Sequence, residues 1–155
     1  MVITRVIIID GGIQSNELVD MISILNFCSK YWVGHSMILG IAIYNVIIKR
    51  VITWSINPLY DNDHSLDIAN RILRNTCEQV LFSIVTQLAI IPHLHGHEIV
   101  IYIPLINLLW FVGRIFYTIG YPNYRIFGWG MSFYPHLATS IFAGHLFVKH
   151  HLKLY

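Results

Sequence analysis

Four long stretches of mostly apolar residues are separated by short polar breaks along the chain. Each stretch can reach the roughly 20 residues that a helix needs to cross the hydrocarbon core of a bilayer. We therefore predict an all-α protein, a four-helix transmembrane bundle in which small and polar residues face neighbouring helices. The predicted helices are Tyr31–Ile48, Ile68–Ile91, Ile99–Tyr121 and Ile126–Val148.

The breaks between these helices contain residues typical of turns. Residues 57–67, NPLYDNDHSLD, are the clearest interruption, and residues 92–98 and 122–125 form two shorter turns. We divide the chain into an N-terminal leader over residues 1–30, a four-span membrane domain over residues 31–150 and a C-terminal tail over residues 151–155. The leader lacks the apolar segment and cleavage site of a signal peptide, so we expect none.

Composition supports the membrane prediction. The 155 residues are 55% hydrophobic and 12% charged, whereas soluble domains carry about 25% charged residues. The alternative, a soluble all-α protein with a large core, leaves too little polar surface to cover four apolar helices. The formal net charge of +2 is small and its basic residues are dispersed, which argues against a nucleic-acid partner. Cys28 and Cys77 are expected to be buried free thiols.

Lysine and arginine are more numerous at the helix ends that hold the first and third breaks. Cytoplasmic loops of membrane proteins carry an excess of these residues, so we expect both of these breaks on the cytosolic side. The residues on that side are Lys49, Arg50, Arg71, Arg74, Arg114 and Arg125.

Two of the predicted helices carry a polar stripe at one end. On the second helix the stripe has the spacing i, i+3, i+4, i+7, which puts Arg71, Arg74, Asn75 and Glu78 on one face. The third helix ends with the same spacing, at Arg114, Tyr117, Thr118 and Tyr121. Because neighbouring antiparallel helices bring these two ends to the same membrane face, we expect the stripes to meet at one depth.

An ionisable residue at membrane depth is costly unless it is paired or lines a cavity. The two stripes contain more arginine than glutamate, and buried guanidinium groups without partners call for an anion. A small ligand with carboxylates would suit, because the guanidinium fork binds carboxylate in a bidentate manner. The alternative is that Glu78 pairs with Arg74 or Arg114 and only fixes the packing of the bundle.

The motif Arg71-x-x-Arg74-Asn75-Thr76-x-Glu78-Gln79, followed by Gly113-Arg114-x-x-Tyr117-x-x-Gly120-Tyr121 and Arg125, resembles the MAPEG superfamily. These are membrane-associated proteins in eicosanoid and glutathione metabolism. The resemblance covers residues 31–150. The segment from Asn57-Pro-Leu to Gln79 and the sequence Arg125-x-Phe-Gly128 look closest to the mattrin-like branch.

The resemblance implies a homotrimer of four-helix subunits in a lipid bilayer, with glutathione bound between neighbouring subunits and accessible from the cytosol. It assigns glutathione binding to Arg71, Arg74, Asn75, Glu78, Arg114, Tyr117 and Tyr121. It makes Arg125 the candidate catalytic residue beside the glutathione sulfur. The thiolate would attack an amphipathic lipid electrophile or reduce a hydroperoxide. The implied location is the endoplasmic reticulum or another secretory or endolysosomal membrane.

Departures from the active members leave catalysis open. Gln79 stands where several of them carry tyrosine, and Tyr121 and Arg125 are only four residues apart. We therefore keep two interpretations. The first is a glutathione-dependent transferase or peroxidase, and the second is a non-catalytic mattrin-like protein in membrane trafficking or stress protection.

Histidines form two further groups. His93, His95 and His97 alternate in the second break, where they either bind zinc or copper or lie in a solvated loop, and we assign no metal site. His136 and His145 are nine residues apart on the fourth helix, which is not the i, i+4 spacing of helical metal ligands. We expect them to make hydrogen bonds between helices.

Overall fold

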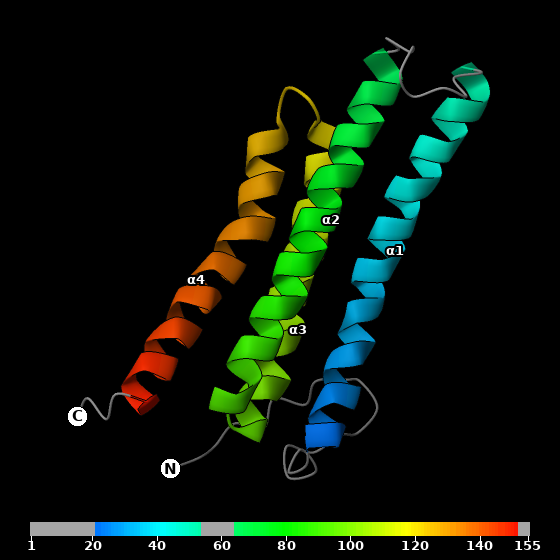
Figure 1. The fold of residues 1–155 in the computed structure, drawn as a ribbon. Helices are drawn as coiled ribbons and strands as arrows, with labels where there is room; N and C mark the ends of the chain where they lie inside the picture. Colours follow the sequence, from blue (N-terminus) through cyan, green and yellow to red (C-terminus); the bar gives the residue numbers. More distant parts are fainter. Residues whose placement is uncertain (1–20, 54–63, 152–155) are drawn as a thin grey trace, which may run out of the picture.

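The computed structural model describes residues 21–53 and 64–151, which form a bundle of four long α-helices with no strand among them (Figure 1). A short 3₁₀-helix, η2, follows the second of these helices. The all-α, four-helix prediction is confirmed. The elements are α1 Met21–Thr53, α2 His64–Ile90, η2 Ile91–His93, α3 Gly96–Gly120 and α4 Arg125–His151.

Helix α1 differs most from its predicted bounds, because it begins at Met21 and not at Tyr31. Residues 21–30, which we assigned to the leader, contain no proline or glycine that would break a helix. They also place Phe27 and Cys28 against α3, and this burial favours the helical turns that carry them. The expectations for residues 1–20, 54–63 and 152–155 lie outside the described residues.

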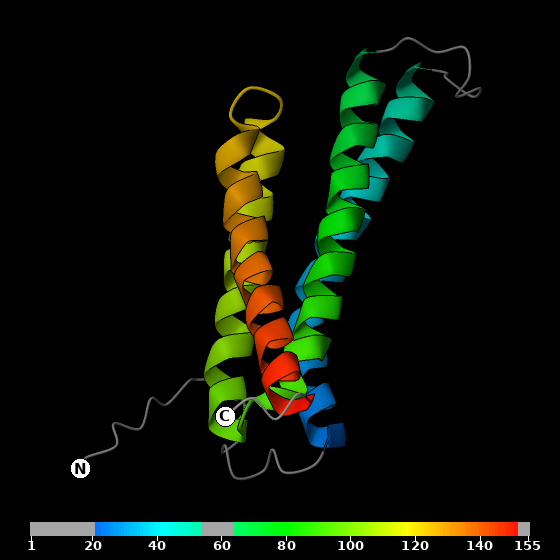
Figure 2. The same ribbon diagram turned by 60° about the vertical axis from the view of Figure 1, so that its left-hand side comes forward.

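The four helices run alternately up and down, and their order around the bundle is α1, α2, α4, α3. The most extensive packing joins α3 to α4 and α1 to α2, followed by α2 with α4 and α1 with α3. Helices α2 and α3 lie on a diagonal and touch little. Toward the end with the α3–α4 turn, the α1–α2 pair splays away from the α3–α4 pair (Figure 2).

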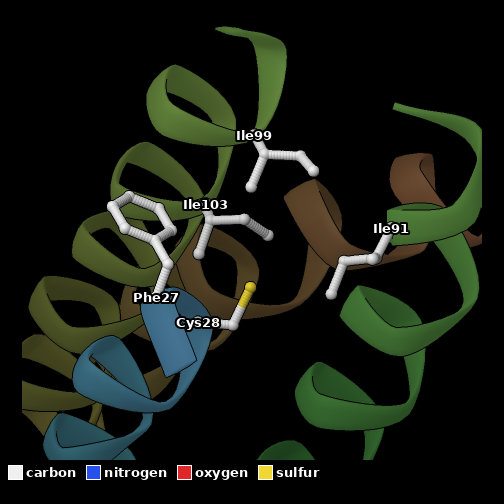
Figure 3. Packing of buried hydrophobic residues seen from close by; sticks show 5 residues of the cluster. All are labelled: Phe27, Cys28, Ile91, Ile99 and Ile103. Atoms are coloured by element: carbon white, nitrogen blue, oxygen red, sulfur yellow. The ribbon is translucent and has the colours of Figure 1, made fainter. Parts of the chain in front are cut away.

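Two apolar clusters hold the ends of the bundle. At the end with the α2–α3 turn, Phe27 and Cys28 of α1 pack against Ile91 of η2 and against Ile99 and Ile103 of α3 (Figure 3). Near the opposite end, α1 and α2 are joined by a smaller cluster formed by Val46, Leu66, Ala69 and Leu73. No cluster of this kind joins the two helix pairs at that end among the described residues.

The middle of the bundle is polar, whereas its outer surface is largely apolar. Exposed residues include Ile41, Leu81, Leu108 and Ile141. The buried polar residues come from all four helices and are His35, Thr76, Gln79, Ser83, Thr86, Gln87, Asn107, Arg114, Ser132, His136 and Thr139. This distribution is the reverse of that in a soluble protein and is typical of a bundle whose outer surface meets lipid.

Two helices, α1 over Met21–Ile52 and α3 over Gly96–Gly120, are long and apolar enough to cross a membrane. Helices α2 and α4 do not meet the same criterion. In α2 the first half carries Asp67, Arg71, Arg74 and Glu78, which lowers its mean hydropathy. That all four helices cross the bilayer therefore stays a prediction.

The turn between α2 and α3 is shorter than predicted, because His97 and Glu98 belong to α3. His95 caps this helix: its backbone N–H donates to Glu98 Oε2 at 2.7 Å, and its side chain accepts from the Glu98 backbone. The rings of His95 and His97 are nearly parallel, with centroids 6.1 Å apart. Across residues 21–53 and 64–151, no group of three or more histidine, cysteine or acidic residues is arranged to hold a metal ion.

Candidate functional site

Arg114 of α3 is fully buried and its guanidinium spans the diagonal to α2. Nη1 donates to Asn75 Oδ1 at 2.8 Å, and Nη2 donates to Thr76 Oγ1 at 2.7 Å. The guanidinium carbon lies 4.2 Å from the centre of the Tyr117 ring, which is a cation–π contact. The third donor atom, Nε, is buried without a partner. No carboxylate of the described residues contacts this arginine, so its positive charge is not neutralised within this part of the chain.

A pocket of about 340 Å³ adjoins this arginine, toward the end of the bundle with the α3–α4 turn. Asn75 and Tyr117, which both contact the Arg114 guanidinium, line it from α2 and α3. Arg125, Ile126 and Trp129 line it from the first turns of α4. The pocket therefore has a polar wall beside two arginines and an apolar wall beside Ile126 and Trp129.

The crossing of α3 and α4 fixes the position of this pocket. A Cβ atom on Gly128 would lie 2.1 Å from Tyr117 N and 2.7 Å from Gly113 O, and a Cβ atom on Gly113 would lie 2.7 Å from Ser132 N. Only glycine allows two helix backbones to approach this closely. Gly113 and Gly128 thus hold Arg114 and Tyr117 next to the first turns of α4.

The α3–α4 turn brings Tyr121 and Arg125 together. The Arg125 guanidinium lies 5.5 Å from the centre of the Tyr121 ring, and the Tyr121 and Tyr117 rings meet edge to face at 5.6 Å. Arg125 is exposed and is the first residue of α4, so it adds positive charge to the positive end of the helix dipole. Thr118 is exposed, and its hydroxyl donates to the Arg114 carbonyl.

The structure brings only part of the predicted α2 stripe to Arg114. Asn75 reaches it, whereas Arg71, Arg74 and Glu78 are exposed on the outward face of α2. Arg71 Nε donates to Asp67 Oδ2 at 2.8 Å in an exposed i, i+4 ion pair. Within one chain, these three residues and Arg114 do not form a common cluster. Asn75 follows Arg71 by four residues and therefore lies at the edge of the polar stripe of α2. This edge is the part of the stripe that faces the interior of the bundle, so Asn75 alone among the stripe residues reaches Arg114.

Cys77 lies on the same outward face of α2. Its thiol is free but exposed, so the expectation that both cysteines are buried is wrong for Cys77. Cys28 is free and buried in the cluster between α1 and α3, as predicted.

A second buried cluster, the central polar network, lies deeper in the bundle. Ser83 Oγ is 2.9 Å from His35 Nε2 and 2.7 Å from His136 Nε2, and it accepts a hydrogen bond from Gln87 Nε2 at 2.9 Å. Asn107 Nδ2 donates to Gln87 Oε1 at 3.0 Å. This network joins α1, α2, α3 and α4 through side chains alone.

The donor and acceptor roles in this network follow from its geometry. His136 Nδ1 is 3.1 Å from the Ser132 carbonyl, which can only accept, so this nitrogen carries the proton. In the neutral ring His136 Nε2 must then accept from the Ser83 hydroxyl, which leaves His35 Nε2 to donate to Ser83. The His35 ring stacks on Trp110, with centroids 3.9 Å apart.

Sequence reasoning found one member of the central polar network. The prediction that His136 bonds between helices is confirmed, since it meets Ser83 of α2, whereas His145, for which the same was expected, is exposed. His35, Ser83, Gln87 and Asn107 were missed. The available signal was the i, i+4 pair Ser83 and Gln87 within a mostly apolar run, a spacing that puts two polar side chains on one buried face.

Comparison with known proteins places the chain in a family. The model of the MAPEG family matches residues 27–145, which is most of the chain. No curated protein and no solved structure gives a significant match. The matched segment contains the Arg114 site, the α3–α4 crossing and the central polar network, and from this match the chain belongs to the MAPEG family of membrane proteins.

Proposed function

We propose that this protein binds glutathione in the pocket beside Arg114 and Arg125, and that it activates the thiol for attack on an amphipathic electrophile. The observation that carries this proposal is the fully buried Arg114 guanidinium, which has no carboxylate partner within the described residues and borders the pocket through Asn75 and Tyr117. An unneutralised buried cation favours an anionic ligand. Family membership supports glutathione, which MAPEG proteins commonly use.

Asn75 is suited to transmit the influence of Arg114 to the ligand. Its Oδ1 accepts from Arg114 Nη1, and this leaves the two Nδ2 donors for a carboxylate or carbonyl of the tripeptide. Tyr117 stacks on the guanidinium and also lines the pocket. In this proposal Arg114, Asn75, Tyr117 and Tyr121 bind glutathione from within one chain.

Arg125 is the candidate catalytic residue in this proposal. It lines the pocket at the first turn of α4, where its own charge and the helix dipole are both positive. Nearby positive charge lowers the pKa of a thiol from its usual value of about 8.5. The thiol proton passes to solvent, and the thiolate is stabilised by the guanidinium, which does not itself give up a proton.

Two reactions follow from such a thiolate. Its sulfur forms a bond to an electrophilic carbon, and the displaced electron pair is protonated by water or departs with a leaving group. Alternatively, the sulfur attacks the terminal oxygen of a hydroperoxide, the O–O bond breaks, and the alkoxide takes a proton from water and leaves as the alcohol. The thiol of a second glutathione then attacks the sulfur of the resulting sulfenic acid, so that glutathione disulfide forms and water leaves. Ile126 and Trp129 supply the apolar wall against which a lipid-like electrophile would lie.

A second copy of the chain would complete the site. The outward stripe of α2 has seven residues at spacings of three and four: Asp67, Arg71, Arg74, Glu78, Leu81, Val85 and Leu88. Its first part is charged, and charged side chains are costly against lipid, which favours contact with another protein surface there. We infer a homotrimer in which Arg71, Arg74 and Glu78 of one subunit face the pocket of the next.

The test is glutathione binding by the purified protein in detergent, measured by calorimetry, followed by thiolate absorbance of the complex. We expect binding to be lost in Arg114→Ala and retained in Arg50→Ala, which removes an exposed arginine at the end of α1. Thiolate absorbance should be lost in Arg125→Ala, while binding is weakened less. Binding that is unchanged in Arg114→Ala would contradict the proposed site.

One observation favours the alternative function, a non-catalytic mattrin-like membrane protein that acts in secretory or endolysosomal trafficking or in stress protection. Gln79 stands where active relatives carry tyrosine, and it is buried with its Oε1 unpartnered. It therefore offers no hydroxyl to a bound thiol. Binding of glutathione without thiolate formation, and without turnover of electrophiles, would support this alternative.

A further inference from the structure

Trp129 of α4 lines the apolar wall of the pocket and is part of a stack of aromatic rings. Its indole stacks on Phe133 with centroids 4.7 Å apart and an interplanar angle of 18°. Phe133 in turn stacks on Phe82 of α2, at 5.5 Å and 28°. Tyr134 meets the indole in a T-shaped contact at 5.9 Å. Three rings from two helices thus form a column that ends at the pocket.

This arrangement makes the indole a rigid element of the pocket wall. Trp129 and Phe133 are one helical turn apart, so their rings overlap along the helix, and Phe82 supports them from the neighbouring helix. Because Phe133 covers one face of the Trp129 indole and Tyr134 meets it in a T-shaped contact, few other rotamers of Trp129 are open to it. A ring that is already fixed loses little entropy when a ligand stacks on it.

We propose that Trp129 selects electrophiles whose reactive carbon is attached to a planar, aromatic or conjugated group, which stacks on the face of the indole opposite Phe133. This inference rests on the proposed glutathione site and names the class of its second substrate. Stacked aromatic groups gain about 0.5–1.5 kcal/mol beyond the contribution of their buried area. A saturated group of the same size gains only the contribution of its buried area. The pocket should therefore bind planar substituents more tightly than puckered ones.

The position of the column relative to the charged groups supports this assignment. Arg125 and Trp129 are separated by four residues on α4, so they lie on one face, about one turn apart, and both line the pocket. A glutathione sulfur held beside Arg125 would carry its substituent one helical turn along α4, which is the depth of the indole. Ile126 also lines the pocket.

The test compares two glutathione conjugates with the same carbon skeleton: S-benzylglutathione, whose ring is planar, and S-(cyclohexylmethyl)glutathione, whose ring is puckered. Calorimetry on the intact protein in detergent should give a preference of about fivefold to tenfold for the planar conjugate. Trp129→Leu should reduce this preference to less than about twofold, and Trp129→Phe should retain most of it. Phe142→Leu, at an exposed aromatic residue farther along α4, serves as the matched control.

The outcomes separate the two proposals. Equal affinity of the wild-type protein for both conjugates overturns the role of Trp129 and leaves the glutathione site standing. The same conclusion follows if Trp129→Leu lowers the affinity for both conjugates by the same factor. If neither conjugate binds, the glutathione site and the inference built on it both fail. Because the wild-type preference is itself decisive, the test does not depend on the folding of Trp129→Leu.

Discussion

Arg114 and Thr76 meet across the diagonal of the bundle, where Nη2 donates to Oγ1 at 2.7 Å. The same threonine hydroxyl donates to the Ile72 carbonyl at 2.7 Å, so its one proton and one of its lone pairs are used. Helices α2 and α3 have little other contact. The hydrogen bonds to Arg114 are therefore a principal connection between these two helices at the end of the bundle that holds the pocket.

Replacing Thr76 with valine tests this connection. The substitution keeps the volume but leaves Arg114 Nη2 buried without an acceptor, which should lower the free energy of unfolding by about 1–3 kcal/mol. Denaturant unfolding in detergent micelles measures the change. Thr118→Val is the matched control, because Thr118 is exposed and bonds only to a carbonyl of its own helix; we expect a change within about 0.5 kcal/mol. Equal effects of the two substitutions would contradict the assigned role.

The contact of Gly128 with Tyr117 gives a second prediction. A methyl group at Gly128 would lie 2.1 Å from Tyr117 N, so Gly128→Ala should force α3 and α4 apart and destabilise the protein. Gly144→Ala, on the same helix, meets nothing within 4 Å and should be neutral or stabilise by about 0.5–1 kcal/mol. Thermal unfolding of the pair measures the difference. A Gly128→Ala variant as stable as Gly144→Ala would mean that the two helices do not cross here.

The central polar network gives a third prediction. Ser83→Ala removes the hydroxyl between His35 and His136 and leaves both Nε2 atoms without this partner. We expect a loss of about 1–3 kcal/mol for each buried group left unsatisfied. Ser36→Ala, which removes an exposed hydroxyl on α1, should change stability by less than about 0.5 kcal/mol. Ring nitrogen chemical shifts of His136 should also change in Ser83→Ala only, and unchanged shifts would contradict the network.

A fourth prediction concerns the outward stripe of α2. Val85→Trp places a large apolar side chain on this stripe, where a neighbouring subunit would leave no room for it. Ile141→Trp makes a similar change on α4 at a residue that is 67% exposed, and lipid should accommodate it. Sedimentation in detergent should therefore show that Val85→Trp disrupts the proposed trimer, whereas Ile141→Trp does not. If both variants sediment as the wild-type protein does, the outward stripe of α2 does not lie in a subunit interface.

The predicted bundle was correct because hydropathy and helix breakers act locally. Proline and turn-forming residues end α2 and α3 within a few residues of the predicted positions. The predicted start at Tyr31 was wrong because nothing in residues 21–30 interrupts a helix, and the apolar residues there could be placed only once their contacts with α3 were known.

The sequence also indicated Arg114, Asn75, Tyr117 and Arg125 as candidate site residues, because helical spacing and the family motif are both readable along the chain. It could not decide which side of α2 faces inward. A polar stripe at period 3.6 specifies one face of a helix, but the neighbours of that face depend on the order of helices around the bundle. With α2 and α3 on a diagonal, Asn75 reaches Arg114, while Arg71, Arg74 and Glu78 point outward.

The sequence by itself therefore determined the number of helices, the membrane character and the residue types of the site, since each depends on local composition and periodicity. Only the tertiary structure decided that Gly113 and Gly128 meet, that Ser83 joins two histidines, and that Phe82 of α2 stacks on Phe133 of α4. These are contacts between residues far apart in the chain. They depend on how four helices are rotated about their axes, and no local pattern specifies that rotation.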